Sequence, residues 1–184
     1  PVAADAVRDG ATVVTMSVDK LLGGPPAEIV LGTRAAVDRM RRTPLTRALR
    51  VDKLTLAALE ATLALYRDPE RARAEIPALA MLAAPVERIR RRAAALAAAL
   101  AAAGLRATVV DSDASVGGGA FPTARIPSAA VALEGNAGSL EARLRGAALP
   151  VIARIADGRV LLDLRSVPEP DDERLAAAVR AALA

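Results

Sequence analysis

The sequence changes character at its longest helical segment, which is expected between residues 85 and 103. This stretch is rich in Ala, Leu and Arg, which favour helices, and Gly104 follows it, where glycine commonly ends a helix. Helical patterns predominate before this segment, and short strand-like runs predominate after it. Two of those runs flank Asp157-Gly158, a dipeptide typical of a tight β-hairpin. The order of these patterns predicts an α/β fold in two parts.

The two parts are predicted to meet between residues 75 and 76. Residues 1–75 have the pattern of the C-terminal part of a larger α/β domain, whereas residues 76–184 indicate a small α/β sandwich with an antiparallel sheet. In the first part, apolar strands are expected at residues 11–15 and 29–31, the first of them buried. The loop between these strands contains Lys20.

Helix signals fill the rest of the first part. Thr33 is expected to cap a helix that runs to Arg41. A long helix is expected from Leu54 to Tyr66, because apolar residues recur there three or four positions apart. In the second part, residues 115–127 are predicted to form a Gly/Pro-rich loop, and residues 173–183 a terminal helix.

The composition excludes several classes of site. The chain has no Cys and no His, which removes thiol nucleophiles, imidazole bases and zinc-finger ligand sets, so no metal site is expected. Aromatic residues make up 1% of the chain, too few for a platform that stacks nucleobases. No apolar run reaches the ~18 residues of a membrane span.

Lys20 is one of only two lysines, and its neighbours are compatible with a chemical role, although a single lysine is a weak signal. An amine reacts with a carbonyl only when it is deprotonated, so a reactive lysine needs burial or neighbouring cations to lower its pKa. Lys20 follows an apolar strand and precedes Leu21-Leu22, which indicates a buried amine, and Ser17 lies three residues before it, where its hydroxyl can bind a phosphate. The alternative, which spacing alone does not exclude, is an ordinary loop lysine at a strand end.

Basic residues are concentrated between Arg39 and Lys53. Arg47 and Arg50 are three residues apart, so in a helix they share one face and can bind an oxyanion together. A solvated basic face is the alternative. The arginines at 88, 90, 91 and 92 indicate a solvated helix flank, with an RNA backbone contact as the second possibility.

Three further features are ambiguous. Gly117, Gly118 and Gly119 can form an anion-binding nest, but no strand leads into a matching helix, so a phosphate-binding loop is unsupported and a connecting segment is the better interpretation. Arg154 and Arg165 lie at the edges of the predicted hairpin. A structural salt bridge is the expected role of each, and binding of a substrate carboxylate is the alternative.

Four segments resemble one enzyme family. Residues 17–32 read SVDKLLGGPPAEIVLG, and residues 43–66 read TPLTRALRVDKLTLAALEATLALY. The later segments read RIPSAAVAL, at residues 125–133, and LPVIARIADGRVLLDLR, at residues 149–165. Together they resemble the bacterial selenocysteine synthases, the L-seryl-tRNA(Sec) selenium transferases. The resemblance places the chain in fold-type I of the pyridoxal-phosphate (PLP) enzymes, as the C-terminal part of the large domain followed by a small α/β domain.

The resemblance implies a role for each matching residue. Lys20 matches the lysine that forms a Schiff base with PLP, Ser17 matches a serine that assists the cofactor phosphate, and Asp19 matches a residue that orders the site or handles protons. Arg47 and Arg50 match arginines that bind the selenium donor, selenophosphate. The implied reaction uses PLP as an electron sink, removes water from the seryl group of seryl-tRNA(Sec), and adds selenium.

Three positions near Lys20 depart from the family pattern. Val18 and Glu28 stand where the family has glycine, and Pro26 stands where it has glutamine. Val18 requires an ordinary φ angle at a position where glycine has more freedom.

The resemblance also implies that the sequence is an incomplete, C-terminal portion. The family has a tRNA-binding region and the first half of the PLP domain ahead of the matching segments. The chain alone is therefore expected to bind PLP weakly or not at all and to be inactive. The complete protein is expected to be a cytoplasmic homo-oligomer that binds seryl-tRNA(Sec), mainly through the missing part, and no membrane.

Two other hypotheses remain open. One is a different fold-type I PLP enzyme, such as a lyase acting on free amino acids, although the Arg47 and Arg50 pair argues against it. The other is a non-catalytic remnant whose α/β domain serves only in assembly or binding. Replacement of Lys20 separates the enzyme hypotheses from the remnant.

Overall fold

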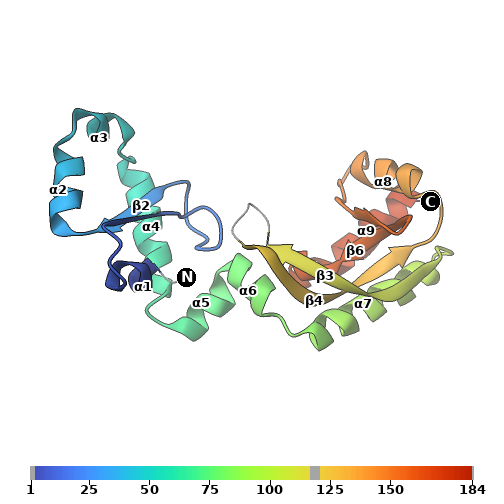
Figure 1. Cartoon of the computed structure of the whole chain (residues 1–184). Helices are drawn as coiled ribbons and strands as arrows, with labels where there is room; N and C mark the ends of the chain where they lie inside the picture. The colour runs from blue at the N-terminus through green and yellow to red at the C-terminus, as the bar shows by residue number, and fades with distance from the viewer. Residues whose placement is uncertain (1–2, 117–120, 184) are drawn as a thin grey trace. The chain divides into compact units, whose positions relative to one another are not determined.

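The computed structural model divides the chain into two compact units, Pro1–Ala80 and Met81–Ala184 (Figure 1). It describes residues 3–116 and 121–183, without the side chains of residues 121–123. The boundary between the units lies five residues after the predicted one. That the two units are the two predicted domains stays a prediction.

The first unit contains a two-stranded hairpin with helices before and after it. Strand β1 (Val13–Ser17) pairs antiparallel with β2 (Glu28–Gly32), so that Ser17 lies opposite Glu28. The helices are α1 (Ala3–Arg8), α2 (Arg34–Arg42), α3 (Pro44–Leu49), α4 (Lys53–Leu65), α5 (Pro69–Glu75) and α6 (Pro77–Ala83), the last of which crosses the unit boundary.

Capping residues determine where these helices begin. The Thr33 side chain accepts a hydrogen bond from the Ala36 N–H at the start of α2, as the sequence predicts. Asp52 caps α4, and Asp68 caps α5, each accepting two backbone N–H groups. Proline follows Asp68 directly, at the position where a helix tolerates it best.

The interior of the first unit is small. Among its described residues, the buried apolar side chains are Val18, Ala72 and Ile76. The strand at β1, predicted to be buried, is not: its side chains are exposed or half-buried, and Val13 is 36% exposed. No further strand among the described residues extends this hairpin into a larger sheet. Large leucines remain exposed by 40–84%, namely Leu45, Leu49, Leu54, Leu56 and Leu63.

The second unit is a four-stranded antiparallel sheet with helices. The strand order is β3-β4-β6-β5. The strands are β3 (Ala107–Val116), β4 (Phe121–Leu133), β5 (Arg154–Ala156) and β6 (Arg159–Asp163). The helices are α7 (Val86–Ala101), α8 (Ala137–Arg145) and α9 (Asp172–Leu183), with short 3₁₀ turns at Leu164–Ser166 and Glu169–Asp171.

One face of this sheet forms the main core. Side chains alternate between the faces of a strand, so Ala129, Val131 and Leu133 of β4 point the same way. They pack with Ile89 and Leu100 of α7, and helices α8 and α9 also contribute to this core (Figure 1). The opposite face carries a smaller cluster built around Ala130, Ala132 and Leu161. This arrangement is the predicted α/β sandwich.

The prediction of a loop at residues 115–127 is wrong for the described residues of that range, 115–116 and 121–127. Strand β3 continues to Val116, and β4 begins at Phe121, so that Asp113 lies opposite Pro127. Exposed and half-buried residues alternate through residues 111–116, which is a strand pattern despite the nearby glycine and proline. Gly117, Gly118 and Gly119 lie outside the described residues.

Candidate functional site

The loop between β1 and β2 is held by its own backbone. The Val18 N–H donates to the Ala27 carbonyl at 3.0 Å, and the Gly24 N–H donates to the Val18 carbonyl at 3.1 Å. The Gly23 N–H donates to the Lys20 carbonyl at 3.1 Å, which closes a four-residue turn. Gly23 has φ +74°, a conformation that favours glycine. Lys20 is therefore the first residue of a defined turn.

Val18 is the anchor of this loop. Its side chain is fully buried, and a Cβ added at Gly24 would lie 2.4 Å from Val18 Cγ1. Val18 also keeps an ordinary φ, because Asp157 is the single non-glycine residue with positive φ in the described ranges. The departure from the family pattern at position 18 is thus accommodated by packing, and Pro26 and Glu28 are exposed.

Ser17, Asp19 and Lys20 form one hydrogen-bonded cluster. Lys20 Nζ donates to Asp19 Oδ1 at 2.9 Å and to Ser17 Oγ at 3.1 Å, and Ser17 Oγ donates to Asp19 Oδ1 at 2.6 Å. The hydrogen bond from Ser17, followed by that from Lys20, lowers the pKa of Asp19. The carboxylate is therefore ionised near neutral pH. The structure brings together all three residues that the sequence assigned to the cofactor end of the site.

The expectation of a buried Lys20 amine is wrong in this chain. The Lys20 side chain is 45% exposed, and the charge beside it is the Asp19 carboxylate at 2.9 Å. The amine is thus neither buried nor placed beside a cation in the described part of the first unit, which are the two surroundings expected of a reactive lysine. Few side chains are buried in the described part of the first unit, namely Val18, Ala72 and Ile76, and the Lys20 amine is not among the groups they cover.

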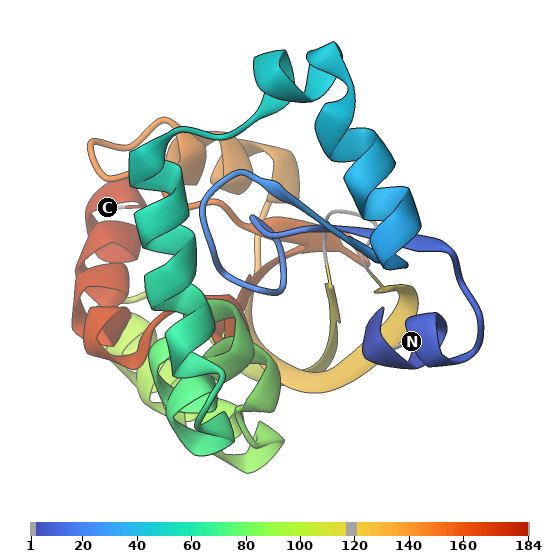
Figure 2. The ribbon, with the colours of Figure 1, turned by 90° about the vertical axis from the view of Figure 1, so that its left-hand side faces the viewer.

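Arg47 and Arg50 do not share a helical face. Helix α3 ends at Leu49, and Arg50 has extended angles, φ −62° and ψ 140°. The chain must leave the helix here because Asp52 caps the start of α4 two residues later. Both arginines are exposed, and Figures 1 and 2 show α3 set apart from the loop that carries Lys20. The structure therefore does not bring them to Lys20 within this chain.

Two residues that sequence reasoning missed hold the loop from outside. The Tyr66 hydroxyl donates to the Leu22 carbonyl at 3.0 Å, and α4 runs alongside the loop (Figure 2). Ile76 is 1% exposed, and a Cβ at Gly23 would lie 2.6 Å from its Cγ2. One indication for Tyr66 was present in the sequence: the hydroxyl of a partly buried tyrosine usually forms a hydrogen bond.

Arg154 and Arg165 stabilise the second unit, but not through salt bridges. The Arg165 side chain is 5% exposed and donates to the carbonyls of Met81, Ala84 and Pro127, at 2.9, 2.7 and 2.6 Å. Arg154 donates to Ser112 Oγ at 2.6 Å and to a strand carbonyl. Their partners are neutral oxygens, so the predicted salt bridges are wrong, while the structural role is correct.

Three of the four arginines of α7 form ion pairs with acidic residues of the second unit. Arg92 is 11% exposed and makes two hydrogen bonds to the Asp172 carboxylate, at 2.8 and 2.6 Å. Arg88 pairs with Glu169, and Arg90 pairs with Asp111. The predicted solvated flank is therefore wrong for Arg92, which joins α7 to α9.

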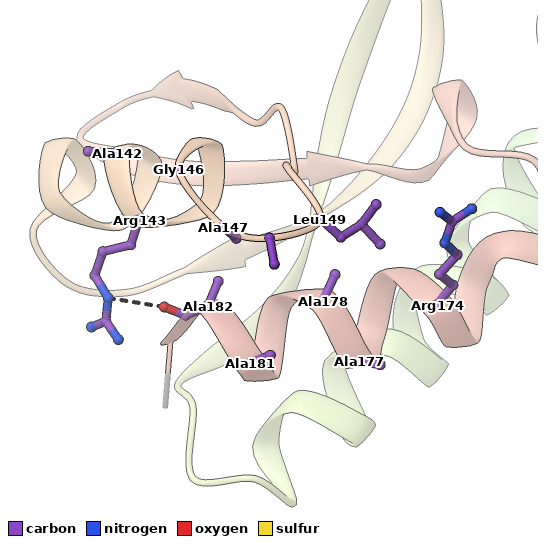
Figure 3. Close-up of a pocket in the computed structure, with 11 residues that line it drawn as sticks. Ala142, Arg143, Gly146, Ala147, Leu149, Arg174, Ala177, Ala178, Ala181 and Ala182 are labelled. Carbon is purple, nitrogen blue, oxygen red and sulfur yellow. Dashed lines mark hydrogen bonds between the residues drawn. The ribbon is translucent and has the colours of Figure 1, made fainter.

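A shallow groove lies between α8 and α9 (Figure 3). Alanines of α9 form one wall, Gly146 to Leu149 form the other, and Arg143 and Arg174 lie along it. Arg143 Nε donates to the Ala182 carbonyl at 3.1 Å. The residues that line this groove include no acid, base or nucleophile, so it offers no chemistry comparable to the Lys20 cluster.

Comparison with known proteins decides the family. The model of the family described as SelA, L-seryl-tRNA selenium transferase, matches residues 1–168. The chain belongs to the SelA family. A relative from Geobacter sulfurreducens named L-seryl-tRNA(Sec) selenium transferase is 44% identical over 98% of this chain. Relatives of the same name from Solidesulfovibrio magneticus and Moorella thermoacetica are 48% and 46% identical, over 98% and 96% of the chain.

The chain spans about 40% of the length of these SelA relatives. The α/β fold is that of the C-terminal part of a fold-type I PLP large domain followed by a small domain with an antiparallel sheet. The small interior and exposed leucines of the first unit agree with a partial SelA domain. None of the helices in the described part of the chain is long and apolar enough to cross a membrane.

Proposed function

We propose that the chain is the lysine-bearing part of an L-seryl-tRNA(Sec) selenium transferase, which uses PLP and selenophosphate to convert seryl-tRNA(Sec) to selenocysteyl-tRNA(Sec). The observation that carries this proposal is the Ser17–Asp19–Lys20 cluster on a glycine turn, in a chain that matches SelA over residues 1–168. An amine beside a hydroxyl and a carboxylate fits the aldehyde and phosphate end of PLP. When bound, PLP supplies an aldehyde for the lysine and an electron sink for the seryl group.

Each residue of the cluster has a distinct task in this proposal. Lys20 would hold the aldehyde end of the cofactor through Nζ. Asp19 orients the amine, since its carboxylate stays ionised and lies 2.9 Å from Nζ. Ser17 donates its hydroxyl to the cofactor phosphate once it is released from Asp19. Arg47 and Arg50 bind selenophosphate, whose charged oxygens suit guanidinium groups.

The tRNA substrate is supported by the charge of the first unit. Between Arg34 and Lys53 the chain has seven basic and two acidic residues, a net charge of +5, against +4 for the whole chain. The arginines near the end of α2, Arg39, Arg41 and Arg42, are exposed. Such a segment suits a phosphate backbone.

The complete enzyme is proposed to be a cytoplasmic homo-oligomer that contacts no membrane. The leucines of α3 and α4, exposed by 40–84%, support burial of this surface in the complete protein. Because Lys20 is half exposed and Arg47 and Arg50 do not share a helical face, the 184-residue chain alone is proposed to be inactive. Addition of PLP should then produce no tight, lysine-dependent absorbance band at stoichiometric cofactor.

A chimera tests the proposed function. Residues 1–184 replace the matching region of the Geobacter sulfurreducens relative, and formation of selenocysteyl-tRNA from seryl-tRNA(Sec) and selenophosphate is measured. Lys20→Ala should abolish turnover, whereas Arg180→Ala, a control at an exposed position of α9, should retain it. Survival of turnover in Lys20→Ala would exclude the enzyme role of this loop and favour a binding remnant. Turnover of free serine in place of seryl-tRNA(Sec) would favour a lyase.

A further inference from the structure

A side chain far away in sequence holds the backbone next to Lys20. Tyr66 is the residue that ends α4, and its hydroxyl donates to the Leu22 carbonyl at 3.0 Å, with the Leu21 carbonyl at 3.5 Å. The two bonded residues are 44 positions apart in the chain. Burial raises the pKa of Tyr66, so the hydroxyl keeps its proton and remains a donor near neutral pH.

A second contact reaches the same turn from the end of α5. Ile76 is 1% exposed, and its Cγ2 occupies the space that a Cβ at Gly23 would need. Gly23 combines this close contact with a φ of +74°, so the turn at Gly23 is fixed both by its backbone angle and by the side chain against it. Tyr66 and Ile76 therefore hold two successive residues, Leu22 and Gly23.

We propose that Tyr66 and Ile76 are positioning residues for Lys20. The turn from Lys20 to Gly23 is closed by a backbone hydrogen bond, so fixing Leu22 and Gly23 also fixes the direction in which the Lys20 side chain leaves the loop. That direction keeps Nζ within 2.9 Å of Asp19 and 3.1 Å of Ser17. The significance for transferase chemistry rests on the proposed function, while the positioning itself does not.

A purely structural role for Tyr66 makes a different prediction. In that case, replacement of Tyr66 lowers the stability of the first unit and does not change the reactivity of Lys20 relative to that of Lys53. A positioning role changes the reactivity of Lys20 relative to that of Lys53, which lies outside the cluster at the start of α4. Because the chain has only these two lysines, their ratio can be measured in a single sample.

The experiment labels the 184-residue chain with a small amount of acetic anhydride and measures acetylation of Lys20 and Lys53 by peptide mass spectrometry. In the unmodified chain, Lys20 should react more slowly, because Asp19 and Ser17 both bind its Nζ. In Tyr66→Phe, the acetylation of Lys20 relative to that of Lys53 should rise towards one by about fivefold. This is the factor that corresponds to the loss of one ordinary hydrogen bond. Ile76→Val should change it in the same direction with a smaller loss of packing.

Thr62→Val is the matched control. Thr62 is also on α4 and close to Gly24, but its hydroxyl donates to the Ala58 carbonyl of its own helix, and valine keeps its shape. Its labelling ratio should equal that of the unmodified chain. An unchanged ratio in both Tyr66→Phe and Ile76→Val overturns the proposal, as does equal labelling of the two lysines in the unmodified chain. Acetic anhydride requires neither PLP nor tRNA, so the result stands even if the chimera lacks transferase activity.

Discussion

Asp52 shows how a single carboxylate organises the segment between α3 and α4. Its Oδ1 accepts the N–H groups of Leu54 and Thr55 at 2.7 and 2.9 Å, and the Thr55 hydroxyl donates to Oδ2. These hydrogen bonds, led by that from the Thr55 N–H, lower the pKa of Asp52. The same carboxylate therefore starts α4 and forces Arg50 out of α3.

Replacement of this cap should have a pH-dependent effect. A carboxylate whose pKa is lower in the folded state stabilises the fold above its unfolded pKa of about 3.9, and that stabilisation is lost as the pH falls through the folded value. Asp52→Ala should therefore reduce helical circular dichroism at pH 7 and much less at pH 2. Asp52→Asn, which keeps a capping oxygen, should behave alike at both pH values. An equal loss for Asp52→Ala at both pH values would contradict this account.

Arg165 joins three separate backbone carbonyls of the second unit through one buried side chain. Arg165→Met leaves the carbonyls of Met81, Ala84 and Pro127 without their donor, and each unpaired buried group costs about 1–3 kcal/mol. The free energy of unfolding, measured with urea, should fall by about 3 kcal/mol. Arg165→Lys should recover only part of this loss. Its ammonium can still donate hydrogen bonds, but it lacks the planar fork of donors that a guanidinium has. The exposed Arg180→Met is the control, and a loss below about 1 kcal/mol for Arg165→Met would refute the role.

Among the elements, α7 and α4 contrast in how their apolar faces are used. Ile89 of α7 is 1% exposed in the main core, whereas Leu54 of α4 is 84% exposed. Ile89→Ala should lower the free energy of unfolding by about 2–5 kcal/mol, because it leaves a cavity. Leu54→Ala should change it by less than about 0.5 kcal/mol in this chain. Urea unfolding of both variants checks the pair, and a comparable loss in each would show that α4 is packed.

Local signals in the sequence predicted most of the elements. The helix expected at residues 54–66 appears as α4, Lys53–Leu65, and the hairpin at Asp157-Gly158 is confirmed, with φ values of 50° and 70°. These features depend on neighbouring residues, such as caps, turn glycines and apolar spacing. A pattern read within a short window is sufficient for them.

The features that the sequence did not predict depend on distant residues or on competing local signals. The break before Arg50 follows from the cap of the next helix, which overrides the three-residue spacing of Arg47 and Arg50. The long β3–β4 hairpin is stabilised by pairing along both strands, which outweighs Pro127. The bond from Tyr66 to Leu22 joins segments 44 residues apart, which no local pattern encodes.

For the whole molecule, the two units differ in how much apolar surface they bury. The described part of the first unit buries Val18, Ala72 and Ile76, whereas the second has a core that joins three helices to the sheet. A domain with so small an interior has little free energy to resist opening. The second unit has its own larger core, so we expect it to fold on its own.

Limited trypsin digestion tests this difference between the units. Exposed arginines in the first unit, such as Arg67 and Arg73, should be cut first, leaving a resistant fragment that ends at the C-terminal helix. Mass spectrometry of the products should show cleavage before Met81 and protection of α7. In the chimera, cleavage at the same arginines should slow markedly. Equal rates of digestion in both units of the isolated chain would contradict the prediction.

The burial of Val18 and Ile76 has a consequence for how this chain can vary. Val18 lies against Gly24 and Ile76 lies against Gly23, and together with Ala72 they are the buried apolar side chains in the described part of the first unit. The side chains that keep water out of this interior therefore also contact the loop backbone that carries Lys20. A substitution at Val18 or Ile76 is therefore expected to change the stability of the first unit and the placement of the Lys20 amine together.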